Sequence, residues 1–208
     1  MSSAARVTKP PKAAASPPPA IPPFPIRRYS VDEYHKMIET GVLTENHRVE
    51  LLHGWLVPKM TVNPPHNFAV TALMERLVAF GARAAVRVQQ PITTSDSEPE
   101  PDVVLALGTN ADYRKRNPRP SECVIVVEVA DTTLHEDRTT KLELYAVAGV
   151  SVYWIVNLLG RRVEVYTQPK SGKKPMYKKR TDYGPRDDVP VVVRGKELGR
   201  IPVKELLP

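Results

Sequence analysis

The segment from residue 123 to residue 130, Cys-Val-Ile-Val-Val-Glu-Val-Ala, most constrains how this chain can fold. Its apolar residues occupy both alternating faces of a strand, which is typical of a strand covered on both sides by other layers. A carboxylate at Glu128 inside such a strand costs several kcal/mol unless its charge is compensated. The segment therefore predicts a buried central strand whose acid has either a structural Arg or Lys partner or a bound cation.

The other elements expected from the sequence fit around this strand. Apolar residues at three- and four-residue spacing predict a helix from about His66 to Phe80, ended by Gly81. Before it, a capping box at Ser30 and Glu33 predicts a helix closed by Gly41, and a strand pair at 49–52 and 55–57 turns at His53-Gly54. After it, we expect strands at 84–88 and 103–107, a helix over about 135–148 ended by Gly149, and a hairpin at 152–156 and 162–166. The chain after Gln168 is expected to form a basic loop, a short strand at 191–193 and a tail. The central order of helix, three strands, helix and strand predicts an α/β fold, with a mixed central sheet flanked by helices.

The composition limits the number of domains and indicates the cellular environment of the protein. Residues 1–28 are rich in Pro, Ala, Ser and Lys, which predicts a disordered tail before a single domain at 29–208. The tail supplies +5 of the net charge of +7, which leaves +2 for the rest, so charge gives only minor support to DNA binding. No apolar run reaches the ~18 residues of a membrane span, so no membrane partner is expected. Cys123 is the single cysteine, which excludes an intrachain disulfide and suits a reducing cytoplasm.

Several enzyme classes lack their sequence signatures. The chain contains no G-x-S-x-G elbow, no G-x-x-x-x-G-K-[ST] phosphate loop, no G-x-G-x-x-G and no H-E-x-x-H. Its histidines lack metal-ligand spacing, so each is interpreted as a surface or helix-cap residue; they are His35, His47, His53, His66 and His135. Lipase-type, nucleotide-hydrolysing and zincin chemistry therefore lose support.

Two acidic residues are expected to meet at one edge of the sheet. Asp102 begins its predicted strand after Pro99 and Pro101, which hold the chain extended. If this strand is an antiparallel neighbour of the strand that ends near Ala130, its start lies about 5 Å from the end of the other. Asp102 and Glu128 would then form a carboxylate pair.

The helix after the central strand carries Asp137 and Lys141 four residues apart, on one helical face. One interpretation is a solvated ion pair between them, worth a few tenths of a kcal/mol. The other is that the Lys141 side chain leans toward the start of its helix and places a cation over the carboxylate pair. Periodicity alone leaves both interpretations open.

Taken together, these residues resemble a known family. The chain is similar, over residues 30 to about 167, to the Uma-type family of putative restriction endonucleases. The runs that carry the resemblance are Arg48-Val-Glu-Leu-Leu-His-Gly54, Val88-Gln-Gln-Pro-Ile92, Ser97-Glu-Pro-Glu-Pro-Asp-Val103, Val126-Val-Glu-Val-Ala-Asp-Thr132, Asp137-Arg-Thr-Thr-Lys141, Leu144-Tyr-Ala146, Ala148-Gly149, Tyr153-Trp-Ile-Val-Asn157 and Val163-Glu-Val-Tyr166. The resemblance implies the PD-(D/E)XK restriction-endonuclease-like fold, and it leaves the basic tail and the loop at 170–180 outside.

The resemblance also implies roles for individual residues. Asp102 matches the aspartate of the PD motif, and Glu128 matches the (D/E)XK acid. Ala130 stands where many superfamily nucleases have lysine, which in this family comes from the following helix, at Lys141. Further polar positions match the surroundings of the site: Glu50 as a third acid or a supporting group, Gln89 and Asp137 as supporting groups.

The activity implied by the resemblance is hydrolysis of DNA phosphodiester bonds. Asp102, Glu128 and the carbonyl of Val129 would hold Mg²⁺, with Mn²⁺ as the alternative, because these are hard oxygen ligands. Lys141 would orient the attacking water or stabilise charge on the phosphate. Two rivals stay open: a non-catalytic nucleic-acid- or protein-binding module that keeps the nuclease fold, and a buried Glu128–Lys141 ion pair without metal. Self-association into a homo-oligomer is also left open.

Overall fold

The computed structural model describes residues 25–80 and 84–208. Most of the expected disordered tail and the expected helix stop at Gly81 lie outside these residues. None of the helices in the described part of the chain has the length and apolar character of a membrane span.

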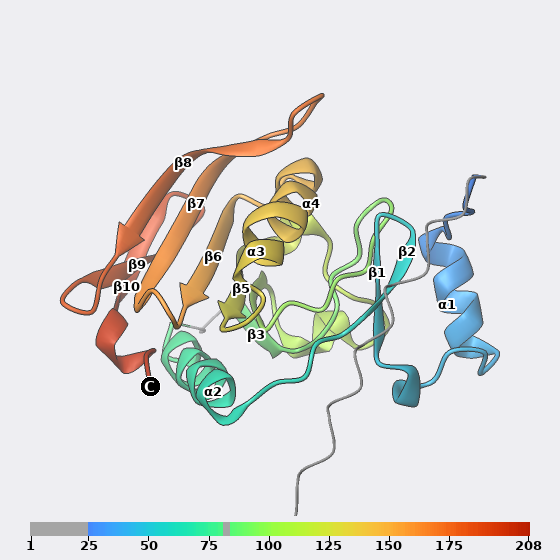
Figure 1. The fold of residues 1–208 in the computed structure, drawn as a ribbon. Helices are drawn as coiled ribbons and strands as arrows, with labels where there is room; N and C mark the ends of the chain where they lie inside the picture. The colour runs from blue at the N-terminus through green and yellow to red at the C-terminus, as the bar shows by residue number, and fades with distance from the viewer. Residues whose placement is uncertain (1–24, 81–83) are drawn as a thin grey trace, which may run out of the picture.

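The centre of the fold is a six-stranded mixed sheet with strand order β3-β4-β5-β6-β7-β8 (Figure 1). The β5 and β6 pair is parallel, and the other neighbours are antiparallel. The strands are β3 (Ala84–Val88), β4 (Val103–Leu107), β5 (Cys123–Ala130), β6 (Val152–Asn157), β7 (Arg162–Lys170) and β8 (Met176–Tyr183). The first three have the bounds expected from the sequence, and all eight residues of β5 are buried, as its apolar pattern predicts.

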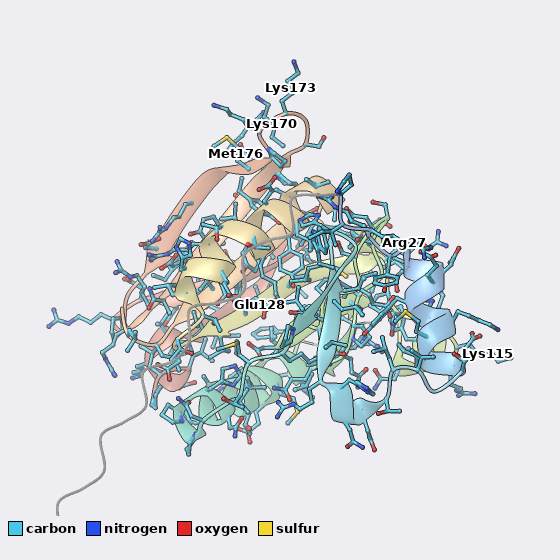
Figure 2. The ribbon with its side chains drawn as sticks, turned by 45° about the vertical axis from the view of Figure 1, so that its right-hand side comes forward. Arg27, Lys115, Glu128, Lys170, Lys173 and Met176 are labelled. Atoms are coloured by element: carbon cyan, nitrogen blue, oxygen red, sulfur yellow. The ribbon has the colours of Figure 1, made fainter. Side chains whose placement is uncertain are left out.

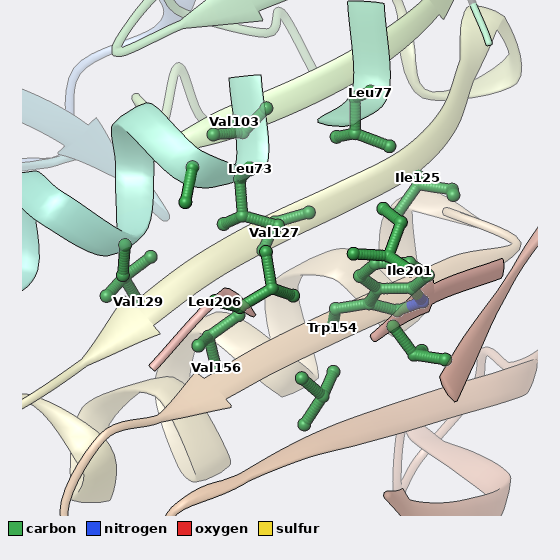
Figure 3. Packing of buried hydrophobic residues seen from close by; sticks show 14 of the residues in the cluster. Leu73, Leu77, Val103, Ile125, Val127, Val129, Trp154, Val156, Ile201 and Leu206 are labelled. Carbon is green, nitrogen blue, oxygen red and sulfur yellow. The ribbon is translucent and has the colours of Figure 1, made fainter. Parts of the chain in front are cut away.

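Helices cover both faces of this sheet, which makes three layers (Figure 1). One face packs against α2 (Pro64–Val78), and Figure 3 shows Leu73 of this helix next to Val127 of β5, with Leu77 nearer to Ile125. The opposite face packs against α4 (Leu142–Ala148), with Tyr145 and Tyr153 in its core. The mixed α/β sandwich expected from the sequence is therefore confirmed.

A separate hairpin, β1 (Val49–Leu52) with β2 (Trp55–Pro58), lies beside the main sheet. Its tight turn at His53 and Gly54 has positive φ at both residues, as expected of a two-residue hairpin loop. A Cβ on Gly54 would lie 2.9 Å from the backbone oxygen of Tyr29, so this position requires glycine. The short elements outside the layers are α1 (Val31–Glu39), which starts with the predicted capping box, and the 3₁₀ turns η1 (Glu45–His47), η2 (Asn110–Tyr113) and η3 (Pro120–Glu122).

The helix expected over 135–148 is not one α-helix. It consists of α3 (Leu134–Glu136), a π-helical turn η4 (Asp137–Lys141) and α4, which ends at Gly149 with φ +79°. The 3.6-residue period of the sequence gives no sign of the wider turn, because its cause lies in contacts with the sheet described below. Single π turns inside α-helices are frequent at functional sites.

The sequence prediction was also wrong after Gln168. The segment expected to be a basic loop instead forms the end of β7 and the edge strand β8. Within β8, the Tyr177 side chain is buried, whereas the basic residues are exposed. The expected short strand at 191–193 is part of a hairpin, β9 (Asp188–Val193) with β10 (Lys196–Pro202), followed by the 3₁₀ turn η5 (Val203–Glu205). These strands lack a strong apolar alternation, and this is why the sequence pattern did not reveal them.

Candidate functional site

The register of β4 and β5 brings Asp102 and Glu128 together. These strands are antiparallel, with Val103 opposite Val127, so one further step along each strand places Asp102 beside Glu128. The backbone N–H of Val129 donates to Oδ2 of Asp102 over 2.8 Å. The juxtaposition expected from the sequence is thus present in the structure.

The chain before β4 is fixed against the β1 hairpin, which positions Glu50. The N–H of Glu98 donates to the carbonyl of Leu51 over 2.7 Å, and the N–H of Glu100 donates to Oε2 of Glu50 over 2.9 Å. Glu50 is buried, although it belongs to a sheet separate from that of Glu128. The site is therefore assembled from two sheets.

Lys141 lies between the acids of these two sheets. Its Nζ is 3.1 Å from Oε1 of Glu128 and 3.3 Å from Glu50, and its side chain is only 12% exposed. The Tyr145 hydroxyl, one turn along the helix, donates to the same Glu128 oxygen over 2.6 Å. The ion pairs of Lys141 are with Glu50 and Glu128, so the expected alternative of a solvated pair with Asp137 does not describe this lysine.

The two other supporting residues named from the sequence belong to different elements. Asp137 is buried at the start of η4, where Thr133 donates to its carboxylate over 2.7 Å. Burial raises the pKa of Asp137 to about 6. Gln89 is exposed at the end of β3, and its backbone N–H donates to the carbonyl of Asp102 over 3.0 Å. Gln89 thus contacts the site through its backbone.

The site holds more negative than positive charge. Burial raises the pKa of Glu128 to about 8, and the charge of Lys141 offsets this only in part. Burial opposes the charge of Lys141, but Glu128, Glu50 and Asp137 outweigh it, so the pKa of Lys141 lies above its ordinary value. One buried lysine therefore faces several acids, an arrangement that favours an additional cation or proton.

His66, interpreted from the sequence as a surface or cap residue, is a further member of the site. His66 is buried in the first turn of α2, and its Nε2 lies 3.1 Å from Oδ2 of Asp102. Burial opposes the protonated ring, but the hydrogen bond and charge of Asp102 raise the pKa of His66 above its ordinary value. Its Nδ1 is buried and has no hydrogen-bond partner among the described residues. No spacing rule marks this position, because the contact depends on how α2 packs on the sheet.

Tyr145 was also missed as a site residue, although a signal for it existed. It follows Lys141 by four residues, as Lys141 follows Asp137, so the three share a helical face. The ring of Tyr145 is fully buried in the core, while its hydroxyl reaches Glu128.

A second buried acid, Glu164 of β7, holds the π turn that carries Lys141. Glu164 is fully buried and accepts from Nε of Arg138 at 3.0 Å, from Asn157 at 2.9 Å and from the Tyr166 hydroxyl at 2.8 Å. Arg180 of β8 lies 3.3 Å from it. Burial opposes the charge of Glu164, but these donors outweigh burial and place its pKa below the ordinary value.

The two acids that bind η4 lie in one row across the sheet. Glu128 pairs with Ile155, and Ile155 pairs with Glu164, so both carboxylates project from the same face. Arg138 and Lys141 of the π turn each reach one of them. The extra residue in this turn therefore lets two side chains of η4 bind the sheet at two separate points.

A cleft of 780 Å³ opens above these residues. Its wall is formed by the β1–β2 hairpin, the chain leading into α2, and η4, and Asp102, Glu128 and Lys141 lie along it. Figure 2 shows Glu128 inside the molecule, between the helix layer and the β1–β2 hairpin. Within residues 25–80 and 84–208, no group of three or more His, Cys, Asp or Glu side chains is arranged to hold a metal ion. A cation here would have to use two carboxylates together with backbone or water oxygens.

Fold and site together define a mixed α/β protein with an acid-rich cleft at one edge of its sheet, in which one lysine is buried. The sequence profile of the Uma2 family, described as "Putative restriction endonuclease", matches residues 31–194. The chain therefore belongs to this family, which confirms the resemblance seen in its motifs.

A solved structure shares the fold. It is the crystal structure of a putative nuclease belonging to DUF820 from Anabaena variabilis, with 16% sequence identity and a TM-score of 0.61. The match covers 88% of this chain and 97% of that chain. No match was found among curated proteins.

Proposed function

We propose that this protein is a metal-dependent endonuclease of the PD-(D/E)XK fold that hydrolyses phosphodiester bonds of DNA. The observation that carries the proposal is the convergence of Asp102, Glu128 and Lys141 on one cleft, from two strands and the following helix. The element order from α2 to β6, helix, three strands, helix and strand, agrees with that fold. Membership in the Uma2 family supports the same activity.

The residues present fit a Mg²⁺ ion, or Mn²⁺ in its place. Mg²⁺ is usually bound in proteins through one or two carboxylates and keeps several waters, so it does not require three acidic side chains. Asp102 and Glu128 supply two hard oxygen donors, and the peptide group of Val129 already lies against Asp102. These residues, with the carbonyl of Val129, would hold the ion. When bound, it would supply Lewis-acid polarisation of the scissile phosphate.

The chain's own cation acts on the water or the phosphate. The ammonium of Lys141 is held by Glu128 and Glu50, so it is fixed in position and charged at neutral pH. A fixed cation in a buried site stabilises charge that develops on phosphate oxygens, and its N–H groups can orient an attacking water. The Tyr145 hydroxyl donates to Glu128 and the N–H of Glu100 donates to Glu50, so the two carboxylates that hold this lysine are themselves fixed.

His66 and the Val129 amide orient Asp102. Both bind Oδ2 of Asp102, at 3.1 and 2.8 Å, so the rotation of this carboxylate is fixed and Oδ1 is left for a ligand. We propose that His66 is a positioning residue for Asp102. Its position at the start of α2 makes this role depend on the packing of the helix rather than on the strands.

One observation favours the rival of a non-catalytic binding module. Lys141 satisfies Glu128 and Glu50 without any metal, as a purely structural ion pair would. A protein with that arrangement could keep the fold and bind nucleic acid or protein without turnover. The two functions differ in whether a divalent ion binds the acids and whether DNA is cut.

Asp102→Asn and Glu128→Gln test the proposal, because each removes a ligand charge with little change of volume. We expect wild-type protein to nick supercoiled plasmid with Mg²⁺ or Mn²⁺ and to gain thermal stability from the ion. Both responses should be lost in either variant, whereas Glu143→Gln, the same exchange at an exposed site on α4, should retain them. Metal-stimulated nicking by carefully repurified Asp102→Asn at the wild-type rate would show that the assignment is wrong. A metal response without nicking would favour the binding module.

A further inference from the structure

The hairpin of β7 and β8 extends beyond the rest of the main sheet as a two-stranded arm. The last pair between β6 and β7 is Val152 with Thr167, whereas β7 and β8 remain paired to Lys170 and Met176. Figure 1 shows this arm projecting past β6 and α4. Residues 168–178 therefore form a feature that the sheet itself does not require.

Positive charge of the folded domain is concentrated on this arm and its base. Residues 165–181 contain six basic residues and no acid: Lys170, Lys173, Lys174, Lys178, Lys179 and Arg180. Residues 1–28 contribute +5 and this segment +6 to a net charge of +7, so the remaining residues sum to −4. Outside the arm, the domain is therefore acidic on balance, and its candidate site is acidic as well.

The five lysines of the arm and its base are free to bind a partner. All are exposed, and none forms an ion pair with a carboxylate in the described part of the chain. Arg180 differs, because it pairs with Glu164 and Asp182. Figure 2 shows Lys170 and Lys173 at the far end of the arm, pointing away from the body of the protein.

Protection of a sheet edge explains only part of this charge. Lysine on an edge strand discourages pairing with another chain, which accounts for Lys178 and Lys179 of β8. Lys173 and Lys174 lie in the turn between the strands, where no edge is exposed. Clustered like charges without partners repel each other, so the charge of the turn requires a different explanation.

The base of the arm is firmly anchored. The Tyr177 ring is buried in the core on the α4 face, and its hydroxyl donates to the carbonyl of Val150 over 2.8 Å. Tyr166, opposite Arg180 in the strand pair, is buried beside it. The arm therefore has a defined direction relative to the sheet that carries the site.

We infer that this arm binds the phosphate backbone of the DNA duplex outside the cleft. The inference rests on the proposed function, since an acidic site repels phosphate and the binding charge must come from another surface. Glu164 of β7 lies in the same row across the sheet as Glu128. Lys170 follows Glu164 by six residues in the same strand, so the two residues are roughly 20 Å apart along β7. A duplex rises about 3.4 Å per base pair, so about six base pairs span this length.

The test compares two triple variants of the full-length chain with equal net charge. The arm variant carries Lys170→Gln, Lys173→Gln and Lys174→Gln; the control carries Lys115→Gln, Lys196→Gln and Lys204→Gln, which are exposed and unpaired with any described carboxylate. Binding of a labelled duplex of arbitrary sequence, several turns long, is measured by anisotropy in EDTA over a range of salt concentrations. EDTA prevents cleavage, and both variants retain the N-terminal residues.

We expect the slope of log affinity against log salt to fall by up to about 2.7 in the arm variant, since each phosphate contact contributes about 0.9. The control should keep the wild-type slope, and melting temperatures of both should match wild type. Equal slopes for the two variants would overturn the inference. So would an arm variant that loses binding to anionic phospholipid vesicles but keeps its affinity for DNA.

This result is independent of the test of catalysis. Cleavage by wild-type protein together with an unchanged slope in the arm variant would overturn the arm alone. A reduced slope without any metal-dependent cleavage would overturn the proposed endonuclease while the arm remains a DNA-binding surface.

Discussion

The buried charge of Lys141 is expected to affect the stability, the cleavage activity and the metal affinity of this protein. Lys141→Met keeps the aliphatic stem and removes the ammonium that lies between Glu50 and Glu128, whose side chains are 9% and 7% exposed. We expect a loss of about 3 kcal/mol in the free energy of unfolding without metal, because breaking a buried ion pair leaves uncompensated charge. Cleavage should fall by roughly 10² or more. Metal affinity should rise, so the Mg²⁺ midpoint of the thermal shift moves to lower concentration.

Lys141→Arg separates the catalytic from the structural role of this residue. Arginine preserves the charge and so restores most of the stability, but its planar head cannot reproduce the position of a single ammonium. If Lys141 acts on water or phosphate, the arginine variant folds normally and still cleaves slowly. If arginine restores stability and cleavage together, the lysine serves only as an ion-pair partner.

The sequence could predict those site residues whose type conflicts with their surroundings. Glu128 is the one charged group in an apolar strand, and the antiparallel register then brings Asp102 beside it. His66 had no such signal, because it meets Asp102 through the packing of α2 on the sheet. The sequence left open whether Lys141 pairs with Asp137 in solvent or places its charge over the carboxylates. This choice depended on the position of Glu50, which lies on a separate hairpin.

At the scale of elements, strands with strong apolar patterns were predictable and the π turn was not. The bounds of β3, β4 and β5 agree with the apolar runs in the sequence. The π turn depends on partners distant in sequence: Glu164 binds Arg138, and the Tyr153 hydroxyl donates to the carbonyl of Asp137 over 3.0 Å. Local periodicity cannot contain this information, because both partners follow the helix in the chain.

Glu164→Gln tests how the sheet holds this turn. It keeps the size of the side chain and should cost about 2 kcal/mol at neutral pH, at the low end for a buried pair because Arg138 is 34% exposed. The folded-state pKa of Glu164 is depressed, so its contribution is present above the ordinary value of 4.5 and is lost as pH falls below it. The difference from wild type, measured by urea unfolding, should therefore shrink below about pH 4.5.

Glu164 could either stabilise the fold alone or also hold Lys141 in position, and these two roles predict different cleavage rates for Glu164→Gln. If η4 is held from β7, Glu164→Gln also lowers the cleavage rate at temperatures where it remains folded, with little change in substrate affinity. Glu143→Gln on the neighbouring exposed face provides the control and should change neither property. A stability difference that stays constant from pH 7 to pH 3 would show that the charge of Glu164 does not contribute.

At the scale of the whole molecule, the C-terminal hairpin completes the layer that covers one sheet face. Residues of β9, β10 and η5 join the core beneath α2, and Figure 3 shows Ile201 beside Trp154 and Ile125. A Cβ on Gly199 would overlap the Phe80 ring, so β10 packs closely on the chain just after α2. The family match ends at residue 194, before β10, yet the core continues to Leu207.

Ile201→Ala tests whether this last segment belongs to the single cooperative core. Ile201 is 1% exposed and lies among apolar side chains, so we expect a loss of about 3 kcal/mol in the free energy of unfolding, measured in urea. Leu198→Ala, in the same strand but 43% exposed, should change it by less than about 0.5 kcal/mol. Ile201 lies in the core on the α2 side of the sheet, whereas Glu128 projects toward Lys141 and Tyr145 on the opposite side, so the metal-induced thermal shift should persist in both variants. Two separate unfolding transitions in Ile201→Ala would show instead that the hairpin unfolds independently of the sheet.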